Sequence, residues 1–316
     1  MAKAAPLPAP RQTVYSLSSM RPSDPIPAAI QSRLTALQAD GRLSAWSLIV
    51  SFMGDAMAPR GGVAPSGALQ ALMARLGIGH GAVRTALSRL AADGWIERSR
   101  EGRNSFYRLS AGVTETVLIA ERRIYAASSL LPAAAPRCLM IAPAPQPEAV
   151  LDALDALGAL QLASEAWLCF AAADSLPAAL RQSGATLADA PGLHPGASMR
   201  AEMARARQGF EMARLLEAYR PVAAALEAGP APSPEDAMAL RCLLIHEWRR
   251  LALRLLPIPA DLVQPDDPEP ETRALVAAIY ARLLAPSETW LDANAALQAG
   301  PLPPPDARLG ARFGAV

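Results

Sequence analysis

The chain has 316 residues and a mass of 33.2 kDa, with 52% hydrophobic residues, 19% charged residues and a formal net charge of +1. These proportions are typical of a globular protein with two or three small domains. Pro or Arg interrupts every apolar stretch before it reaches the roughly 20 residues of a membrane span, so no transmembrane helix is expected.

The beginning of the chain predicts a disordered arm. Residues 1–27 are rich in Pro, Ser and Ala and lack the apolar core and cleavage site of a secretory signal. We interpret residues 1–41 as this arm and a lead-in. The three cysteines, Cys138, Cys169 and Cys242, are far apart and form no CxxC pair, which predicts neither a disulfide framework nor a zinc site and favours a cytoplasmic location.

Charge is distributed unevenly along the chain. Residues 42–108 carry nine Arg against four acidic residues, a local net charge of +5, whereas residues 266–316 carry seven acidic residues against four Arg. A basic N-terminal part joined to a neutral or acidic remainder is typical of a polyanion-binding head on a body with another task.

Residues 42–112 predict a winged helix. Apolar residues recur at helical spacing over residues 43–53, 65–76 and 79–93, and Gly77 and Gly94 end the last two helices. Two β-like runs, residues 95–99 and 105–109, then flank a Gly- and Asn-containing turn. Three helices followed by a hairpin are the elements of a winged helix.

A winged helix binds the DNA major groove with the unpacked face of its third helix. The apolar stripe of that helix leaves polar residues on the opposite face, and two Arg stand at the hairpin turn. The candidate DNA-binding residues are therefore His80, Arg84, Thr85, Ser88, Arg89, Arg100 and Arg103. Arg84 is suited to guanine or phosphate, and the wing residues Arg100 and Arg103 to the minor groove or the backbone.

The remaining chain predicts a linker helix with a small α+β domain over residues 113–196, and a helical domain over residues 197–300. Strands are expected at 138–142 and 166–171, weaker ones near 160–162 and 185–187, and helices at 147–157 and 176–182. This alternation favours a ferredoxin-like fold. Four helices are expected at 198–227, 234–256, 269–284 and 287–298, followed by a disordered tail over residues 301–316. The overall class is α+β, mostly helical.

Two separated segments resemble the PaaX-type transcriptional repressors of phenylacetate catabolism. The first comprises SLIVSFMGDAMAPRGG (47–62) and LGIGHGAVRTALSRLAADGWIERSREGRNSFYRLS (76–110), and the second is CLLIHEWRRLALRLLPIPADLVQ (242–264). The resemblance implies a homodimeric, double-stranded-DNA-binding repressor that an aryl-CoA thioester, typically phenylacetyl-CoA, releases from DNA. Two features depart from the family pattern: a Trp-rich stretch is absent around residues 122–136, and Asp-Asp-Pro-Glu-Pro (266–270) replaces a Trp-Pro-Gly segment.

An anionic CoA effector needs Arg side chains for its phosphates, and the second resembling segment offers His246, Arg249 and Arg250. The alternative interpretation is that Glu247 pairs with Arg250 on a solvated helix face. No metal-ligand spacing and no nucleophile or phosphate-loop motif is present, so neither a metal, a cofactor nor an enzymatic activity is expected.

Two other functions remain open. One is a winged-helix module for protein interaction without sequence-specific DNA binding, and the other is a CoA-thioester-binding enzyme with an accessory winged helix. Loss of specific DNA binding on replacing Arg84 and Arg103 distinguishes the repressor from the first, and thioester turnover identifies the second.

Overall fold

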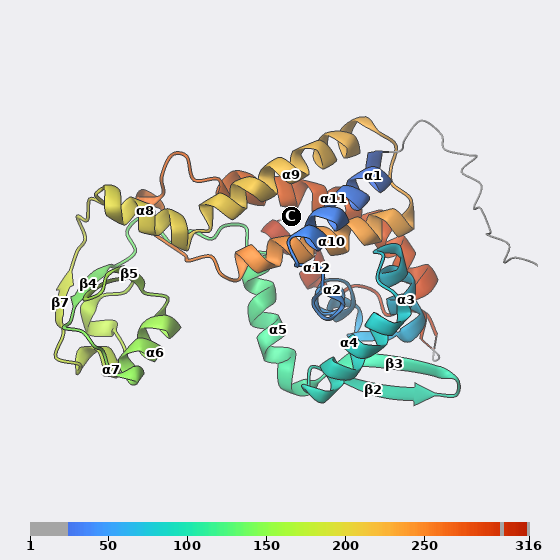
Figure 1. The fold of residues 1–316 in the computed structure, drawn as a ribbon, viewed down its shortest axis with the longest axis horizontal. Coiled ribbons are helices and arrows are strands. Elements are labelled where there is room, and N and C mark those ends of the chain that lie inside the picture. Colours follow the sequence, from blue (N-terminus) through green and yellow to red (C-terminus); the bar gives the residue numbers. More distant parts are fainter. Residues whose placement is uncertain (1–24, 298–299, 315–316) are drawn as a thin grey trace, which may run out of the picture.

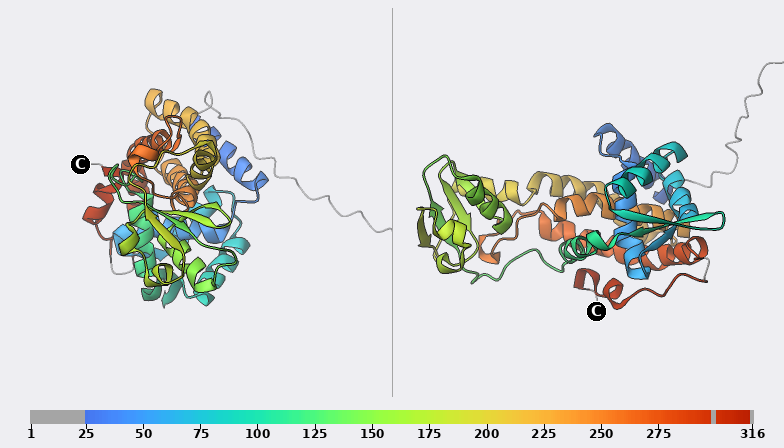
Figure 2. Two further views of the ribbon diagram at one scale, coloured as in Figure 1. Left: turned by 90° about the vertical axis from the view of Figure 1, so that its left-hand side faces the viewer. Right: turned by 90° about the horizontal axis from the view of Figure 1, so that it is seen from below.

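The computed structural model describes residues 25–297 and 300–314, and it divides into a large helical body and a small α+β domain at one end (Figures 1 and 2). The described part is mostly helical with two small antiparallel sheets. The expected α+β, mostly helical class is therefore confirmed. No helix in this part of the chain is long and apolar enough to cross a membrane.

The N-terminal module has the expected three helices and a hairpin. Its elements are α2 (Ala45–Phe52), a π-helix (Met53–Met57), a 3-10 turn (Ala58–Arg60), β1 (Val63–Pro65), α3 (Ser66–Arg75), α4 (His80–Ala92), β2 (Ile96–Glu101) and β3 (Asn104–Leu109). Gly77 and Gly94 follow α3 and α4 with φ angles of 72° and 71°, a conformation that glycine adopts readily. The short strand β1 was not predicted; it pairs antiparallel with β3 and gives the sheet order β1-β3-β2.

The α+β domain is joined to this module by α5 (Ala111–Ile124). Its elements are β4 (Cys138–Ile141), α6 (Glu148–Leu157), β5 (Leu160–Ala163), β6 (Ala166–Cys169), α7 (Ala178–Arg181) and β7 (Thr186–Asp189). All strand pairs are antiparallel, in the order β5-β6-β4-β7. Because side chains alternate along a strand, Trp167 and Cys169 pack among α6 and α7, while Leu168 faces α8 and Ile258 on the other side.

The C-terminal helices differ from the expected set at two places. They are α8 (Ala197–Ala206), α9 (Gly209–Ala228), α10 (Pro234–Ala252) and α11 (Glu269–Asn294). The expected helix over 198–227 is broken where Gln208 takes a φ of 56°, between α8 and α9. The expected pair 269–284 and 287–298 is one helix through Pro286. Burial of Leu283 and Leu291 beside α10 offsets the roughly 3 kcal/mol that an internal proline costs.

One hydrophobic core joins the N-terminal module to the C-terminal helices. Helix α10 packs against α2, α3 and α5, and its Leu240, Leu244 and Trp248 are fully buried. The ranges 42–112 and 197–300, expected as separate domains, therefore form a single packed unit. The α+β domain has its own core.

Residues 25–39, which were expected within the arm and lead-in, form helix α1 (Pro25–Ala39). Ile26, Ile30, Leu34 and Leu37 are buried along one side of this helix, where it packs on α9 and α10. The disorder expected for residues 1–24 lies outside the described residues.

The expected disordered tail was also wrong over its described part. Residues 300–314 contain a short helix α12 (Ala307–Gly310) and return to the junction of the N-terminal module with α5 and α11 (Figure 2). Leu309 and Arg312 are buried there. The composition of the tail suggested disorder, but Arg308 and Arg312 also bond to residues of the folded body that are distant in the sequence.

Candidate nucleic-acid interface

Helix α4 buries one side and exposes the other. Its buried side chains recur at three- and four-residue intervals: Val83, Ala86, Leu87 and Leu90. The opposite, exposed face carries all five residues predicted to bind DNA from this helix: His80, Arg84, Thr85, Ser88 and Arg89. The amphipathic spacing alone was enough to find this face, because a helix that packs by one stripe must present the other residues to solvent.

The hairpin directs its basic and acidic side chains to different faces. Ile96 pairs with Leu109 at the base of the hairpin and is buried in the core. Alternation along β2 then places Arg98 and Arg100 on the face of Ile96, whereas Glu97 and Glu101 lie on the other face. The acidic residues of the hairpin therefore point away from α4. Arg103 lies in the exposed turn between the strands.

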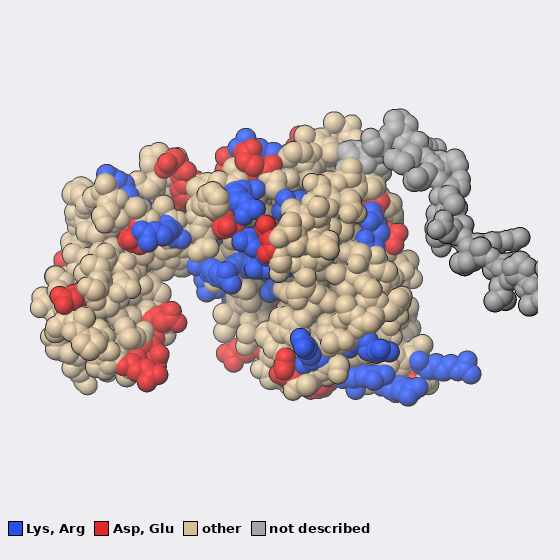
Figure 3. Space-filling model, in the orientation of Figure 1, with Lys and Arg blue, Asp and Glu red and all other residues tan. Residues whose placement is uncertain are grey.

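A shallow hollow of about 320 Å³ joins α3, α4 and the hairpin. It is lined by, among others, Ser66, Gln70, His80, Arg84, Arg98 and Ser105. Figure 3 shows Arg side chains gathered along the edge formed by α4 and the β2–β3 hairpin. Gln70 and Arg98 were not among the predicted residues. Arg98 could have been found from its spacing, because it stands two residues before Arg100 on the same strand.

The basic side chains of this surface are largely free. In the described part of the chain, the side chains of Arg84, Arg89, Arg100 and Arg103 make no hydrogen bond or ion pair, and Arg98 donates from Nη2 to Ser105 Oγ at 2.8 Å. In the same module, Arg60 donates from Nη1 to Glu288 at 2.6 Å, and Arg75 pairs with Asp236. The unpaired charges therefore gather on the exposed face of α4 and the hairpin, where they are available to phosphates.

The three predicted effector-binding residues do not form one site. His246 is fully buried, with Nδ1 3.4 Å from Ser51 Oγ. Arg249 donates from Nε to Ser51 Oγ at 2.7 Å and from Nη2 to the Ser47 carbonyl at 3.1 Å, which joins α10 to α2. Burial, reinforced by the positive charges of Arg249 and Arg250, lowers the pKa of His246 to about 4. Arg250 alone of the three lines an open groove.

The alternative pairing of Glu247 with Arg250 was wrong. Glu247 accepts hydrogen bonds from Arg33 Nε at 3.0 Å and from the Tyr219 hydroxyl at 2.8 Å. It therefore ties α1 and α9 to α10, and the guanidinium of Arg250 has no hydrogen bond or ion pair within the described residues.

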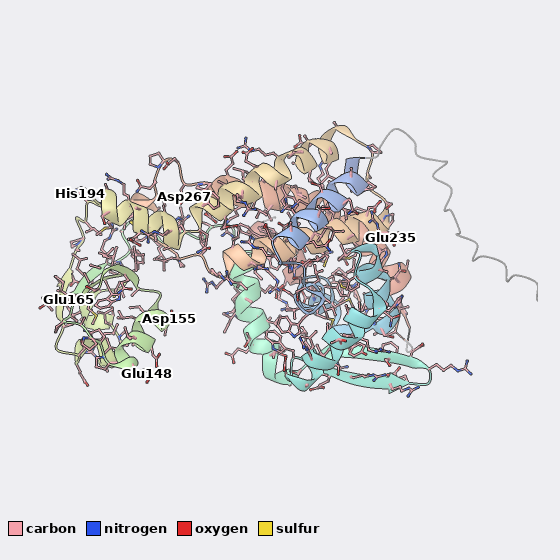
Figure 4. The ribbon with its side chains drawn as sticks, in the orientation of Figure 1. Glu148, Asp155, Glu165, His194, Glu235 and Asp267 are labelled. Carbon is pink, nitrogen blue, oxygen red and sulfur yellow. The ribbon has the colours of Figure 1, made fainter. Side chains whose placement is uncertain are left out.

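Possible metal ligands and nucleophiles are placed as follows in the structure. Among residues 25–297 and 300–314, no three His, Cys, Asp or Glu side chains lie close enough together to hold a metal ion. The three cysteines are buried, and burial raises the pKa of Cys169 to about 11 and that of Cys242 to about 12. Glu148, Asp155 and Glu165 stand at the periphery of the α+β domain, apart from one another (Figure 4).

Comparison with known proteins identifies two family segments in this chain. Residues 44–113 match the family described as PaaX-like protein, and residues 205–293 match the PaaX-like protein C-terminal domain. The transcriptional repressor PaaX of Escherichia coli (strain K12) is 31% identical over 298 residues, which cover 87% of this chain and 91% of that protein. The chain belongs to the PaaX-like family.

The family resemblance seen in the sequence is thereby confirmed. The first matched segment contains all seven predicted DNA-binding residues, and the second contains His246, Arg249 and Arg250. These two PaaX-like segments are the parts of the chain that share one core. Among solved structures, the uncharacterized protein Rv0674 from Mycobacterium tuberculosis matches with a TM-score of 0.45 and 17% identity, covering 77% of this chain and 98% of that one.

Proposed function

We propose that this protein is a transcriptional repressor of phenylacetate or related aromatic catabolism, which binds operator DNA through a winged helix and is released by an aryl-CoA thioester such as phenylacetyl-CoA. Membership of the PaaX-like family and the 31% identity to a transcriptional repressor support the regulatory part. The observation that carries the DNA-binding part is the surface of α4 and the hairpin, whose arginines are exposed and lack acidic partners.

The proposed mode of binding follows from the shape of this surface. Helix α4 enters the major groove, where Arg84 reaches a guanine edge or a phosphate and the shorter His80 and Ser88 reach base edges. Arg100 and Arg103 extend from the hairpin to the flanking backbone or minor groove. Arg98, which lies in the hollow between the helix and the hairpin, is an additional phosphate contact.

We also propose that the protein acts as a homodimer. Two copies of α4 in successive major grooves lie about 34 Å apart on one side of the duplex, which requires an operator with an inverted repeat. The rigid packing of α10 against α2 and α3 makes the N-terminal module and the C-terminal helices move as one unit. A ligand that acts on the C-terminal helices therefore changes the position of the whole DNA-binding unit within the dimer.

Selection from a random double-stranded DNA library, followed by fluorescence anisotropy on the enriched sequence and on a scrambled duplex, tests the proposal. We expect an enriched inverted repeat. Arg84→Ala should reduce the preference for the enriched sequence by roughly tenfold or more, the effect of one lost base contact. Arg205→Ala is the matched control, since Arg205 is exposed on α8 and pairs with Glu202 far from α4. If no sequence is enriched, the result contradicts the proposed repressor function.

The two alternative functions predict different results. An interaction module without specific DNA binding gives no enriched sequence, and its partner binding is unchanged in Arg84→Ala. An enzyme acting on CoA thioesters turns over phenylacetyl-CoA when the purified protein is incubated with it. The repressor predicts no turnover and a loss of DNA binding on adding the thioester.

A further inference from the structure

Two adjoining cavities lie on the far side of the body from the DNA-binding surface. The first, of about 420 Å³, lies between α1, α9 and α10, and its basic lining residues include Arg42, Arg214, Arg250 and Arg254. The second, of about 640 Å³, lies between α8, the start of α9 and the segment after α10, and its apolar lining includes Met203, Ile258 and Leu262. The cavities meet at Gln208, Phe210, Glu211 and Ala213, which line both.

The first cavity contains two guanidinium groups without a direct ionic partner in the described chain, although Glu211 and Glu247 also line it. Arg250 and Arg254 stand one turn apart at the end of α10, and neither guanidinium has a hydrogen bond or ion pair within the described residues. Burial and the nearby charges of Arg42 and Arg254 lower the pKa of Arg250. Two guanidinium groups that lie close together and are not paired with a carboxylate can bind an anion with several charges.

The junction of the two cavities exposes an aromatic side chain. Phe210 is 75% exposed, the largest exposure among the large hydrophobic side chains identified in the described chain. It is the second residue of α9 and lines both cavities. An apolar group attached to the anion can cover Phe210 and enter the second cavity, which removes apolar surface of both partners from water.

Two further basic groups of the first cavity, Arg42 and Arg214, are paired with carboxylates on its exposed side. Arg42 Nη1 lies 3.1 Å from Glu211, and Arg214 Nη2 lies 3.3 Å from Asp40. The four side chains are 29–48% exposed, and exposed pairs of this kind contribute little stability, so a bound anion can replace the carboxylates. Asp40 directly follows α1 and Arg42 precedes α2, so this exchange takes place at the entrance to the DNA-binding module.

We infer that these cavities form the effector site: an organic polyanion places its anionic groups on Arg250, Arg254 and Arg42, and its apolar group lies beside Phe210 in the second cavity. Binding displaces Glu211 from Arg42 and shifts the segment between α1 and α2. This inference rests on the proposed ligand-responsive function and names the site through which a ligand acts. Asp266–Pro268, part of the segment that differs from the family pattern, lines the second cavity. This difference therefore affects which apolar group the cavity accepts.

Isothermal titration calorimetry of the full-length protein with phenylacetyl-CoA, free coenzyme A and phenylacetate tests the site without involving DNA. We expect phenylacetyl-CoA to bind most tightly, because it alone fills both cavities. The double variant Arg250→Ala/Arg254→Ala should bind phenylacetyl-CoA and coenzyme A with roughly tenfold or more lower affinity, as expected for lost charged hydrogen bonds. Phe210→Ala should lower the affinity for phenylacetyl-CoA but leave the affinity for coenzyme A unchanged.

Arg282→Ala is the matched control, because Arg282 is exposed on α11 and lines neither cavity. Equal affinities of the double variant, the control and the unaltered protein would overturn the inference, as would the absence of binding by all three compounds. Glu211→Gln removes the competing carboxylate and should tighten phenylacetyl-CoA binding. The double variant should still bind DNA without ligand, so failure of the site and failure of the DNA-binding proposal give different results.

Discussion

Arg312 Nη1 lies 2.8 Å from Asp55 Oδ1 and joins the C-terminal segment to the N-terminal module across 257 positions of the sequence. Asp55 also accepts hydrogen bonds from Arg241 Nε at 2.7 Å, from the Tyr125 hydroxyl at 2.5 Å and from the Tyr280 hydroxyl at 2.9 Å. Burial alone would raise the pKa of Asp55, but Arg241 and Arg312 outweigh it and hold the carboxyl below its usual range. One buried carboxylate thus connects the π-helix, α5, α10, α11 and the tail.

Replacing Arg312 with Ala should destabilise the protein strongly. The substitution leaves the buried carboxylates of Asp55 and Glu121 without a shared cation, and breaking a buried pair from one side costs about 3–5 kcal/mol of unfolding free energy. Arg308→Ala is the control from the same segment, because Arg308 is 44% exposed and its loss should cost below about 1 kcal/mol. Urea denaturation followed by circular dichroism measures both. If both variants lost the same unfolding free energy, the bonds of Arg312 to Asp55 and Glu121 would contribute no more stability than the exposed pair of Arg308.

Arg103→Ala should reduce the salt dependence of DNA binding. Each phosphate contact contributes about 0.9 to the slope of log K against log salt concentration, so loss of one contact should lower the magnitude of the slope by about that amount. A residue that contacts only phosphate should weaken binding to all sequences by a similar factor. Anisotropy at four salt concentrations on specific and scrambled duplexes measures both quantities. A selective loss on the specific duplex would instead assign Arg103 to a base contact.

Stability should fall as the pH is lowered from about 6.5 to 4 because of His246. Its folded pKa of about 4 lies below its ordinary value of 6.5, so the unfolded chain binds a proton that the folded chain excludes within this window. The contribution is fully present above pH 6.5, and its loss amounts to at most about 3 kcal/mol. Denaturation at pH 7 and pH 5 measures this effect. The difference in unfolding free energy between the two pH values should be smaller for His246→Gln than for the unaltered protein.

The control for this pH dependence is His194→Gln. His194 is exposed in the segment before α8, so its replacement should preserve the difference in stability between pH 7 and pH 5 (Figure 4). If His246→Gln and His194→Gln show the same pH dependence, His246 is not the responsible group.

Local patterns predicted which residues share the exposed surface of α4 and the hairpin, because that surface is built from residues close together in the sequence. The stripe containing Val83 and Leu90 determines which side of α4 is exposed, and the turn around Gly102 determines where Arg103 lies. The sequence could not indicate that Arg249 bonds to Ser47 and Ser51, because this contact depends on how α10 docks on α2. The seven predicted residues lie on one surface, but their contacts with DNA stay a prediction.

The two terminal segments were mispredicted for different reasons. Helix α1 carries Ile26, Ile30, Leu34 and Leu37 at helical spacing, and the interpretation of residues 1–41 as an arm and lead-in overlooked this signal. The tail is rich in Pro and carries no comparable periodicity. The order of both segments comes from partners distant in sequence, such as Glu247 for Arg33 and Asp55 for Arg312. Propensity and periodicity describe only what a segment can do by itself.

Ile30→Ala should test whether α1 belongs to the folded core. Ile30 is fully buried between α1 and the C-terminal helices, and removing such a side chain leaves a cavity that costs about 2–5 kcal/mol. Gln31→Ala, at the exposed neighbouring position, should change the unfolding free energy by less than about 0.5 kcal/mol. Urea denaturation of both variants measures the difference. If Ile30→Ala were as stable as Gln31→Ala, α1 would not be part of the core, and the groove that it forms with α9 and α10 would lose one wall.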